Sequence, residues 1–214
     1  MKENKLLRGL CVLTAALMLG LTGCANGSDT NDSDAQSQAA TAEVQSAWTE
    51  LDQTTITKEM GMGWNLGNQL EASNAGIPSE TTWGNPTISE DLIKAVKEQG
   101  FKTVRIPVSY LDKIGAAPDY TIDSAWLDRV QEVVDYVVGN DLYAIINIHG
   151  DGYYTVDKSW LRCVDDNQDE IKDKYEKVWA QIADRFKDYD QHLIFESMNE
   201  ESDNTYGKPN AIGY

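Results

Sequence analysis

The pattern of apolar and polar residues predicts strands that alternate with amphipathic helices. Short apolar runs, expected to be buried strands, lie at residues 63–66, 103–108, 143–148 and 193–198. Between them, apolar residues recur every three or four positions, as on one face of a helix. The clearest series is Ile171, Tyr175, Val178, Trp179, Ile182 and Phe186. Apolar strands separated by helices predict a parallel sheet with right-handed crossovers.

Residues that favour helix ends support these boundaries. Ser89 is expected to cap the first of these helices, and Gly100 is expected to end it in a left-handed conformation. Asp123 or Ser124 is expected to cap the second helix, and Gly139 is expected to end it.

Polar side chains gather where the predicted strands end. They are Asn65 and Asn68 after the first strand, Arg105 in the second, His149 and Asp151 after the third, and Asn199 and Glu200 after the fourth. In a parallel barrel, the carboxyl ends of the strands converge on one active site. A carboxylate surrounded by hydrogen-bond donors suits a substrate rich in hydroxyl groups.

Several classes of site are not expected. Gly61-Met62-Gly63 precedes the first strand, so the glycine turn that holds phosphate between strand and helix in doubly wound folds is missing. The chain has two histidines, His149 and His192, at opposite ends of the predicted sheet, so we expect neither a metal site nor a cofactor. A net charge of −17 argues against nucleic acid as a partner.

The N-terminus has the features of an export signal. Lys2, Lys5 and Arg8 precede an apolar stretch, residues 10–21, that is short for a membrane span. The stretch ends in Leu21-Thr22-Gly23-Cys24, which is similar to a bacterial lipobox. We therefore expect residues 1–23 to be a lipoprotein signal peptide and Cys24 to carry a lipid anchor to the membrane. The alternative is an ordinary cleaved signal with an incidental cysteine.

The remaining chain divides by composition. Residues 24–46 are rich in small and polar residues and are expected to form a disordered tether. Residues 47–214 are expected to form the folded region, in which Cys163 is the single cysteine and is expected to be buried or idle.

Four segments resemble successive motifs of glycoside hydrolase family 5, the cellulase family. They are Gly63-Trp64-Asn65-Leu66-Gly67-Asn68, Val104-Arg105-Ile106-Pro107-Val108-Ser109, Ile146-Asn147-Ile148-His149 and Ser197-Met198-Asn199-Glu200. The resemblance implies a (β/α)8 barrel, of which residues 47–214 would supply about the first four βα units. Such barrels typically need about 250 residues.

The resemblance also implies a retaining mechanism that uses two glutamates. Glu200 would be the acid/base, and the nucleophile would come from a later strand, beyond Tyr214. Asn199 would hydrogen-bond the 2-hydroxyl of the sugar, Arg105 would orient the nucleophile, and His149 and Asn68 would bind substrate.

The chain departs from the family pattern at two positions. Many relatives have proline where this chain has Glu201, and a second histidine where it has Gly150. Glu201 is therefore a competing candidate for the catalytic carboxylate. We favour Glu200, because it follows Asn199 directly and neighbouring side chains leave a strand on different sides.

Together these features predict a retaining hydrolase of β-1,4-glucans such as cellulose or xyloglucan, anchored at a bacterial cell surface. Because the nucleophile is expected beyond Tyr214, the chain alone is expected to be inactive. The alternative is a non-catalytic surface lipoprotein that binds glycans, with Trp64, Trp83 or Trp160 as a stacking platform.

Overall fold

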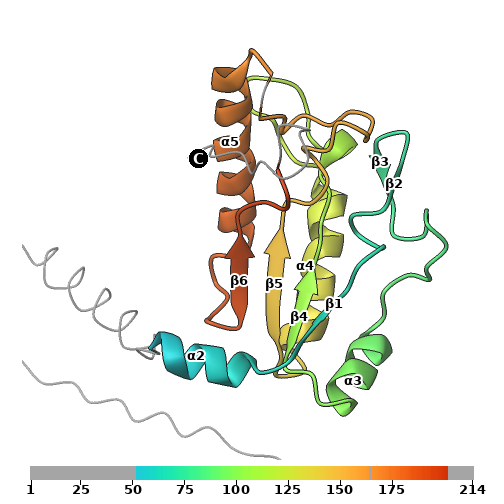
Figure 1. Ribbon diagram of the computed structural model, residues 1–214, viewed down its shortest axis with the longest axis vertical. Helices are drawn as coiled ribbons and strands as arrows, with labels where there is room; N and C mark the ends of the chain where they lie inside the picture. Colours follow the sequence, from blue (N-terminus) through green and yellow to red (C-terminus); the bar gives the residue numbers. More distant parts are fainter. Residues whose placement is uncertain (1–51, 164, 202–214) are drawn as a thin grey trace, which may run out of the picture. The chain divides into compact units, whose positions relative to one another are not determined.

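The structure is a computed structural model that describes residues 52–163 and 165–201 (Figure 1). The predicted signal peptide, Cys24 and the tether lie outside the described residues. No helix in the described part of the chain is long and apolar enough to cross a membrane.

A four-stranded parallel sheet forms the centre of the folded region. Its strands are β1 (Gly63–Asn65), β4 (Thr103–Ile106), β5 (Tyr143–Asn147) and β6 (Leu193–Glu196), and they are paired in that order. Thr103 pairs with both Gly63 and Tyr143, so the three strands start level with one another. The predicted parallel sheet is confirmed, and each of its strands lies beside the strand of the same sheet that precedes it in the chain.

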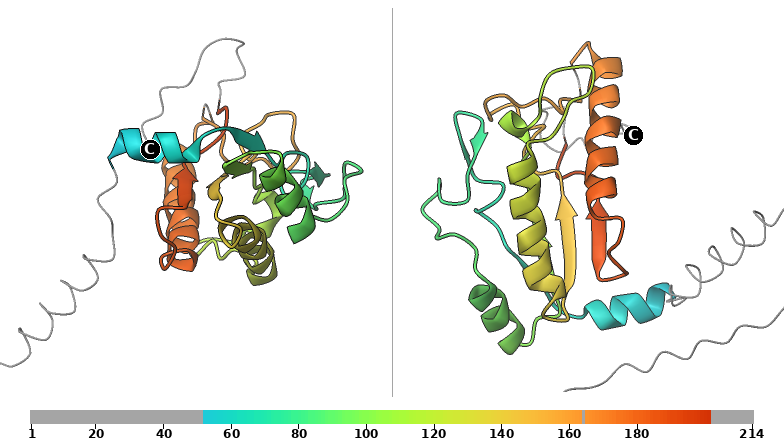
Figure 2. Two further views of the ribbon diagram at one scale, coloured as in Figure 1. Left: turned by 90° about the horizontal axis from the view of Figure 1, so that it is seen from below. Right: turned by 180° about the vertical axis from the view of Figure 1, so that it is seen from behind.

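Helices α3 (Glu90–Glu98), α4 (Ser124–Val138) and α5 (Gln168–Arg185) follow β1, β4 and β5. Figure 2 shows α4 and α5 side by side against the same face of the sheet. Their apolar stripes and the strands form one core, which includes Val104, Ile146, Val134 and Val178. The face of the sheet opposite these helices carries polar side chains, and these build the site described below.

The predicted helix ends are largely confirmed. Ser89 caps α3 by accepting a hydrogen bond from the Leu92 amide at 3.3 Å, and Gly100 follows with a left-handed φ of 92°. Asp123 caps α4, since its carboxylate accepts the Trp126 amide at 2.8 Å. Gly139 ends α4 in a right-handed conformation, contrary to the usual left-handed glycine stop.

Several elements differ from the prediction. All four strands end one or two residues before the predicted limits, because the chain turns to form the loops of the site. Three short elements were not predicted: the helix α2 (Gln53–Met60), the hairpin of β2 (Ser73–Asn74) and β3 (Ile77–Pro78), and the 3-10 helix η1 (Leu111–Lys113).

Candidate active site

The polar side chains at the carboxyl ends of the strands come together around Arg105. Its Nε and Nη2 donate to the two carboxylate oxygens of Glu196 at 2.6 and 2.5 Å. Nη2 also donates to Oδ1 of Asn199 at 2.8 Å, and Nη1 donates to Oδ1 of Asn65 at 3.0 Å. A single guanidinium group thus connects β1, β4, β6 and the loop after β6.

Glu196 was not predicted as a site residue. Its Oε1 also accepts a hydrogen bond from Nδ2 of Asn147 at 3.0 Å, so three donors hold the carboxylate. The hydrogen bonds that Arg105 donates to Glu196 lower the pKa of Glu196 and raise the pKa of Arg105. Both side chains are therefore ionised. Arg105 lies in β4 and Glu196 in β6, so the strands and the charge-assisted hydrogen bonds hold the two groups in place.

The resemblance implied that Arg105 orients a nucleophile, whereas its described carboxylate partner is Glu196. A guanidinium group has five N–H donors. Four of them have acceptors within the described residues, and one N–H of Nη1 has none there. That donor is available to a further carboxylate.

Glu200 lies in the loop that follows β6, with an exposed side chain and a left-handed φ of 47°. Its Oε2 accepts a hydrogen bond from the Tyr153 hydroxyl at 3.1 Å. The same hydroxyl accepts a hydrogen bond from Nδ2 of Asn199 at 2.6 Å. Tyr153 comes from the loop after β5 and was not predicted as a site residue.

His149 is half-buried beside Tyr153, with the two rings edge to face at a centroid distance of 6.3 Å. Its Nδ1 lies 3.4 Å from Nδ2 of Asn147. Burial lowers the pKa of His149, so the imidazole is neutral near pH 7 and can both donate to and accept from a hydroxyl group. The other histidine, His192, packs against Tyr143 at the opposite end of the sheet, as predicted.

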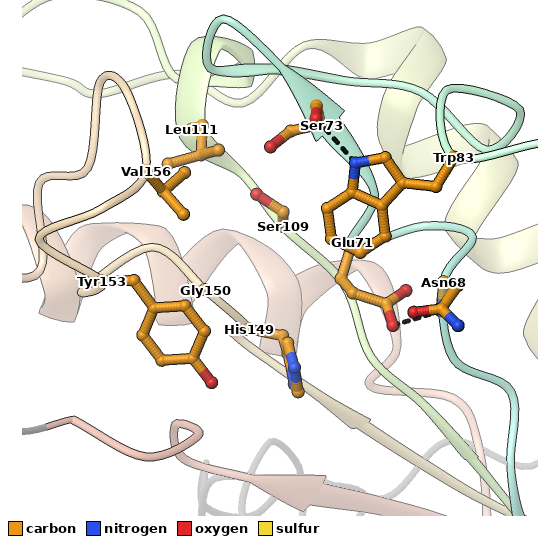
Figure 3. A pocket seen from close by; sticks show the side chains of 10 residues that line it. All are labelled: Asn68, Glu71, Ser73, Trp83, Ser109, Leu111, His149, Gly150, Tyr153 and Val156. Carbon is orange, nitrogen blue, oxygen red and sulfur yellow. Dashed lines mark hydrogen bonds between the residues drawn. The ribbon is translucent and has the colours of Figure 1, made fainter.

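A cavity of about 250 Å³ adjoins this group of residues. Figure 3 shows His149 and Tyr153 on one side of the cavity and Asn68, Glu71 and Trp83 on the other. Glu71 fixes the turn after β1 by accepting the backbone amides of Asn68 at 2.5 Å and Gln69 at 2.9 Å. Asn68 is exposed and has a left-handed φ of 66°.

Trp83 is the most exposed of the three tryptophans proposed as platforms. Its side chain is 53% exposed, and Nε1 donates to the Ser73 carbonyl oxygen at 2.9 Å. Trp64 packs partly buried against the core. Trp160 is held by a hydrogen bond to Asp151 at 2.7 Å. Trp83 alone of the three lines the cavity.

Comparison with known proteins identifies the family. The cellulase family, glycosyl hydrolase family 5, matches residues 70–211. The chain belongs to glycoside hydrolase family 5. The family's barrel fold is thereby confirmed, and the parallel sheet with its helices forms part of that barrel.

The chain is similar to endoglucanase A of Paenibacillus barcinonensis, with 58% identity over 74% of this chain and 40% of that protein. Among solved structures, the family 5 xyloglucanase of Paenibacillus pabuli has 61% identity and a TM-score of 0.71, over 72% of this chain and 43% of that one. The endoglucanase of Ruminococcus champanellensis with bound cellotriose has 43% identity and a TM-score of 0.66, over 76% and 47%. The chain thus spans less than half the length of these relatives.

Glu201, at the position where the resemblance to family 5 led us to expect proline, is less exposed than Glu200. Its side chain packs against Gly152, and both carboxyl oxygens are buried without a hydrogen-bond partner among the described residues. Burial, together with the charge of Asp151, raises the pKa of Glu201 to about 8. A buried carboxyl group in these surroundings is neutral at pH 7.

Asp151 was expected among the polar residues of the cleft, but it is fully buried. It accepts hydrogen bonds from the Ser109 hydroxyl at 2.8 Å, the Tyr110 amide at 3.0 Å and the Trp160 indole. The bonds from Ser109 and Tyr110 tie the loop after β5 to the loop after β4. Burial raises the pKa of Asp151 to about 6.

Cys163 is buried. Within residues 52–163 and 165–201, no group of three or more His, Cys, Asp or Glu side chains could hold a metal ion.

Proposed function

We propose that the protein containing these residues is a retaining hydrolase of β-1,4-glucans such as cellulose or xyloglucan, with Glu200 as its general acid/base. The observation that carries this proposal is the position of the Glu200 carboxyl group. It is exposed at the carboxyl end of the sheet and is held by Tyr153, which lines the cavity. Relatives described as endoglucanases and a xyloglucanase support the choice of substrate.

A retaining glycosidase needs a second carboxyl group, about 5 to 5.5 Å from the first, that attacks the sugar. Glu196 does not suit this role, because Arg105 and Asn147 occupy its oxygens. We propose that the nucleophile comes from a later strand of the barrel. The remaining N–H of Arg105 Nη1 would then orient it.

The other predicted residues have suitable groups for binding the sugar. Asn199 uses one N–H of Nδ2 for Tyr153, and the second N–H is available to a sugar 2-hydroxyl. His149 and Asn68 line the cavity, where they can hydrogen-bond other hydroxyl groups. Glu200 would first protonate the leaving oxygen and then, as a base, activate the water that releases the product.

The test compares two neighbouring glutamates in the full-length protein. Glu200→Gln removes the proton donor, so hydrolysis of xyloglucan and carboxymethyl cellulose should fall by about 10²–10⁴-fold or more. Glu201→Gln is the matched control and should retain most of the turnover, because both carboxyl oxygens of Glu201 are buried beside Gly152. An inactive Glu201→Gln beside a nearly normal Glu200→Gln would refute the assignment.

A non-catalytic glycan-binding protein is the second candidate, favoured by the exposed indole of Trp83 beside the cavity. Exposed aromatic rings bind sugar faces without any chemistry. Binding of xyloglucan without reducing-end release by the full-length protein would support this candidate.

We also propose a location. Residues 1–23 would be a lipoprotein signal peptide, Cys24 the lipidated residue and residues 24–46 a tether. The enzyme domain, residues 47–214 and the chain that completes the barrel, would then work at the bacterial cell surface. The lipobox-like sequence ending in Cys24 supports this proposal.

A further inference from the structure

We propose that Tyr153 is a positioning residue for Glu200, and that it makes Oε1 of Glu200 the oxygen that carries the catalytic proton. The inference rests on the proposed function of Glu200 as the acid/base. It follows from the directions of the hydrogen bonds that run from Arg105 through Asn199 and Tyr153 to Glu200.

The directions begin at Arg105, because a guanidinium group has donors and no acceptor. Nη2 of Arg105 lies 2.8 Å from the side chain of Asn199, so the atom facing it must be the amide oxygen. The amide nitrogen of Asn199 then faces the other way. It lies 2.6 Å from the Tyr153 oxygen and donates to it, because an amide nitrogen does not accept hydrogen bonds.

Tyr153 therefore accepts from Asn199 and has its own proton left to donate. Oε2 of Glu200 lies 3.1 Å away and accepts that proton. Burial, with a smaller contribution from Glu200, raises the pKa of Tyr153 to about 12. The hydroxyl group is therefore protonated at neutral and acidic pH. Oε2 accepts this hydrogen bond whether Glu200 is ionised or protonated. In a protonated carboxyl group, the carbonyl oxygen is a better acceptor than the hydroxyl oxygen, so Oε2 is the carbonyl oxygen. The acid proton thus belongs to Oε1.

The loop that carries Tyr153 is held from two sides. Asp151, two residues earlier, is anchored by Ser109, the Tyr110 amide and Trp160. The Tyr153 ring packs edge to face on His149. A hydroxyl held in this way limits rotation of the Glu200 carboxyl group, whose side chain is otherwise exposed.

The chemical consequence is a fixed direction of proton transfer. In the first step, the glycosidic C–O bond breaks, its electron pair stays on the leaving oxygen, and that oxygen takes the proton from Oε1. The nucleophile's carboxylate forms the new bond to the anomeric carbon. In the second step, Oε1 takes a proton from water as the water oxygen displaces the nucleophile.

The experiment uses Tyr153→Phe in the full-length protein, with Tyr154→Phe as the matched control. The ring of Tyr154 lies against Arg162 at 5.2 Å. Each variant is assayed on xyloglucan and on a dinitrophenyl β-cellobioside, whose leaving group needs no protonation. Losing one hydrogen bond to an ionisable group should lower kcat on xyloglucan about 10-fold, with little change in KM. On the aryl substrate, kcat/KM should change less than about 2-fold, because this ratio reports formation of the intermediate.

Tyr154→Phe should match the parent protein on both substrates. An unchanged kcat of Tyr153→Phe on xyloglucan, or an equal loss on both substrates, would overturn the inference, since a general structural defect affects both. Glu200→Gln in the same assay separates the two claims. If it retains xyloglucan hydrolysis, the acid/base assignment fails; if it is inactive while Tyr153→Phe is normal, only the role of Tyr153 fails.

Discussion

Glu200 and Glu201 are adjacent in the chain, but their carboxyl groups have different surroundings. Glu200 is exposed and accepts a hydrogen bond from Tyr153, whereas the carboxyl oxygens of Glu201 are buried beside Gly152. An exposed carboxyl group can exchange protons with a substrate and with water. A buried one acts on the stability of the fold instead, through its protonation.

Stability should therefore depend on the protonation of Glu201. Its pKa in the folded protein, about 8, lies above the ordinary value of 4.5, so the folded state binds this proton more tightly than the unfolded state does. The resulting stability is fully present below about pH 4.5 and is lost as the pH rises towards 8. Asp151, with a pKa raised to about 6, acts in the same direction over a lower range.

Glu201→Gln should flatten this dependence by removing the buried ionisable group. We expect the variant to have a larger free energy of unfolding than the parent at pH 8 and a smaller gain at pH 5. Denaturant titrations of the full-length protein at both pH values measure this difference. Glu98→Gln, at an exposed position of α3, is the control and should leave the pH dependence unchanged. A parallel shift of Glu201→Gln at both pH values would contradict the linkage.

Some residues of the candidate site could be predicted from the sequence, and others could not. Arg105, His149, Asn199 and Glu200 are polar residues at or after apolar strands, and the structure brings all four together. Glu196 carries the same signal, a charge within an apolar run, and could have been found. Tyr153 had no such signal, because its role depends on how the loop after β5 folds back over the strand ends.

Among the secondary-structure elements, those with repeated apolar spacing were predicted best. Helices α4 and α5 and strands β4 and β5 each place several side chains in the core, so their patterns are long enough to read. The β2–β3 hairpin has two residues in each strand, which is too short for any alternation to show. The short helix α2 has no buried residue, so its sequence has no apolar stripe from which a helix could be predicted.

The start of α4 gives a prediction for a whole element. The sequence left Asp123 and Ser124 as alternative caps, and the structure assigns the cap to Asp123 through its bond to the Trp126 amide. Asp123→Ala should destabilise the protein by about 1 kcal/mol, because a backbone donor at the helix start loses its acceptor. Ser124→Ala should have little effect on the unfolding midpoint. Equal effects of the two substitutions would show that the cap bond does not stabilise α4.

For the molecule as a whole, the net charge bears on how the protein could attach to a membrane, if the proposed signal peptide directs its export. The net charge of −17 leaves neutral glycans as suitable partners and gives no attraction to anionic lipid headgroups. Attachment to a membrane would therefore depend on acyl chains at Cys24, since residues 24–46 are mostly small or polar and contain no long apolar stretch.

Cys24→Ala should accordingly move the protein from the membrane fraction to the medium or to the soluble fraction. Fractionation of cells followed by immunoblotting measures this change. Cys11→Ala is the matched control, because Cys11 lies within the apolar stretch of the predicted signal peptide, and it should leave the protein in the membrane fraction. Cys24→Ala remaining in the membrane pellet would refute the lipid anchor.

The central claim is that Glu200 is the acid/base of a retaining family 5 hydrolase, and rescue by azide tests it most directly. Full-length Glu200→Ala is incubated with dinitrophenyl β-cellobioside and azide, and the product is identified by NMR. The leaving group needs no acid, so the covalent intermediate forms, and azide attacks it without help from a base. We predict faster turnover with azide and a cellobiosyl azide of β configuration. An absence of acceleration by azide, or a product of α configuration, would contradict the account.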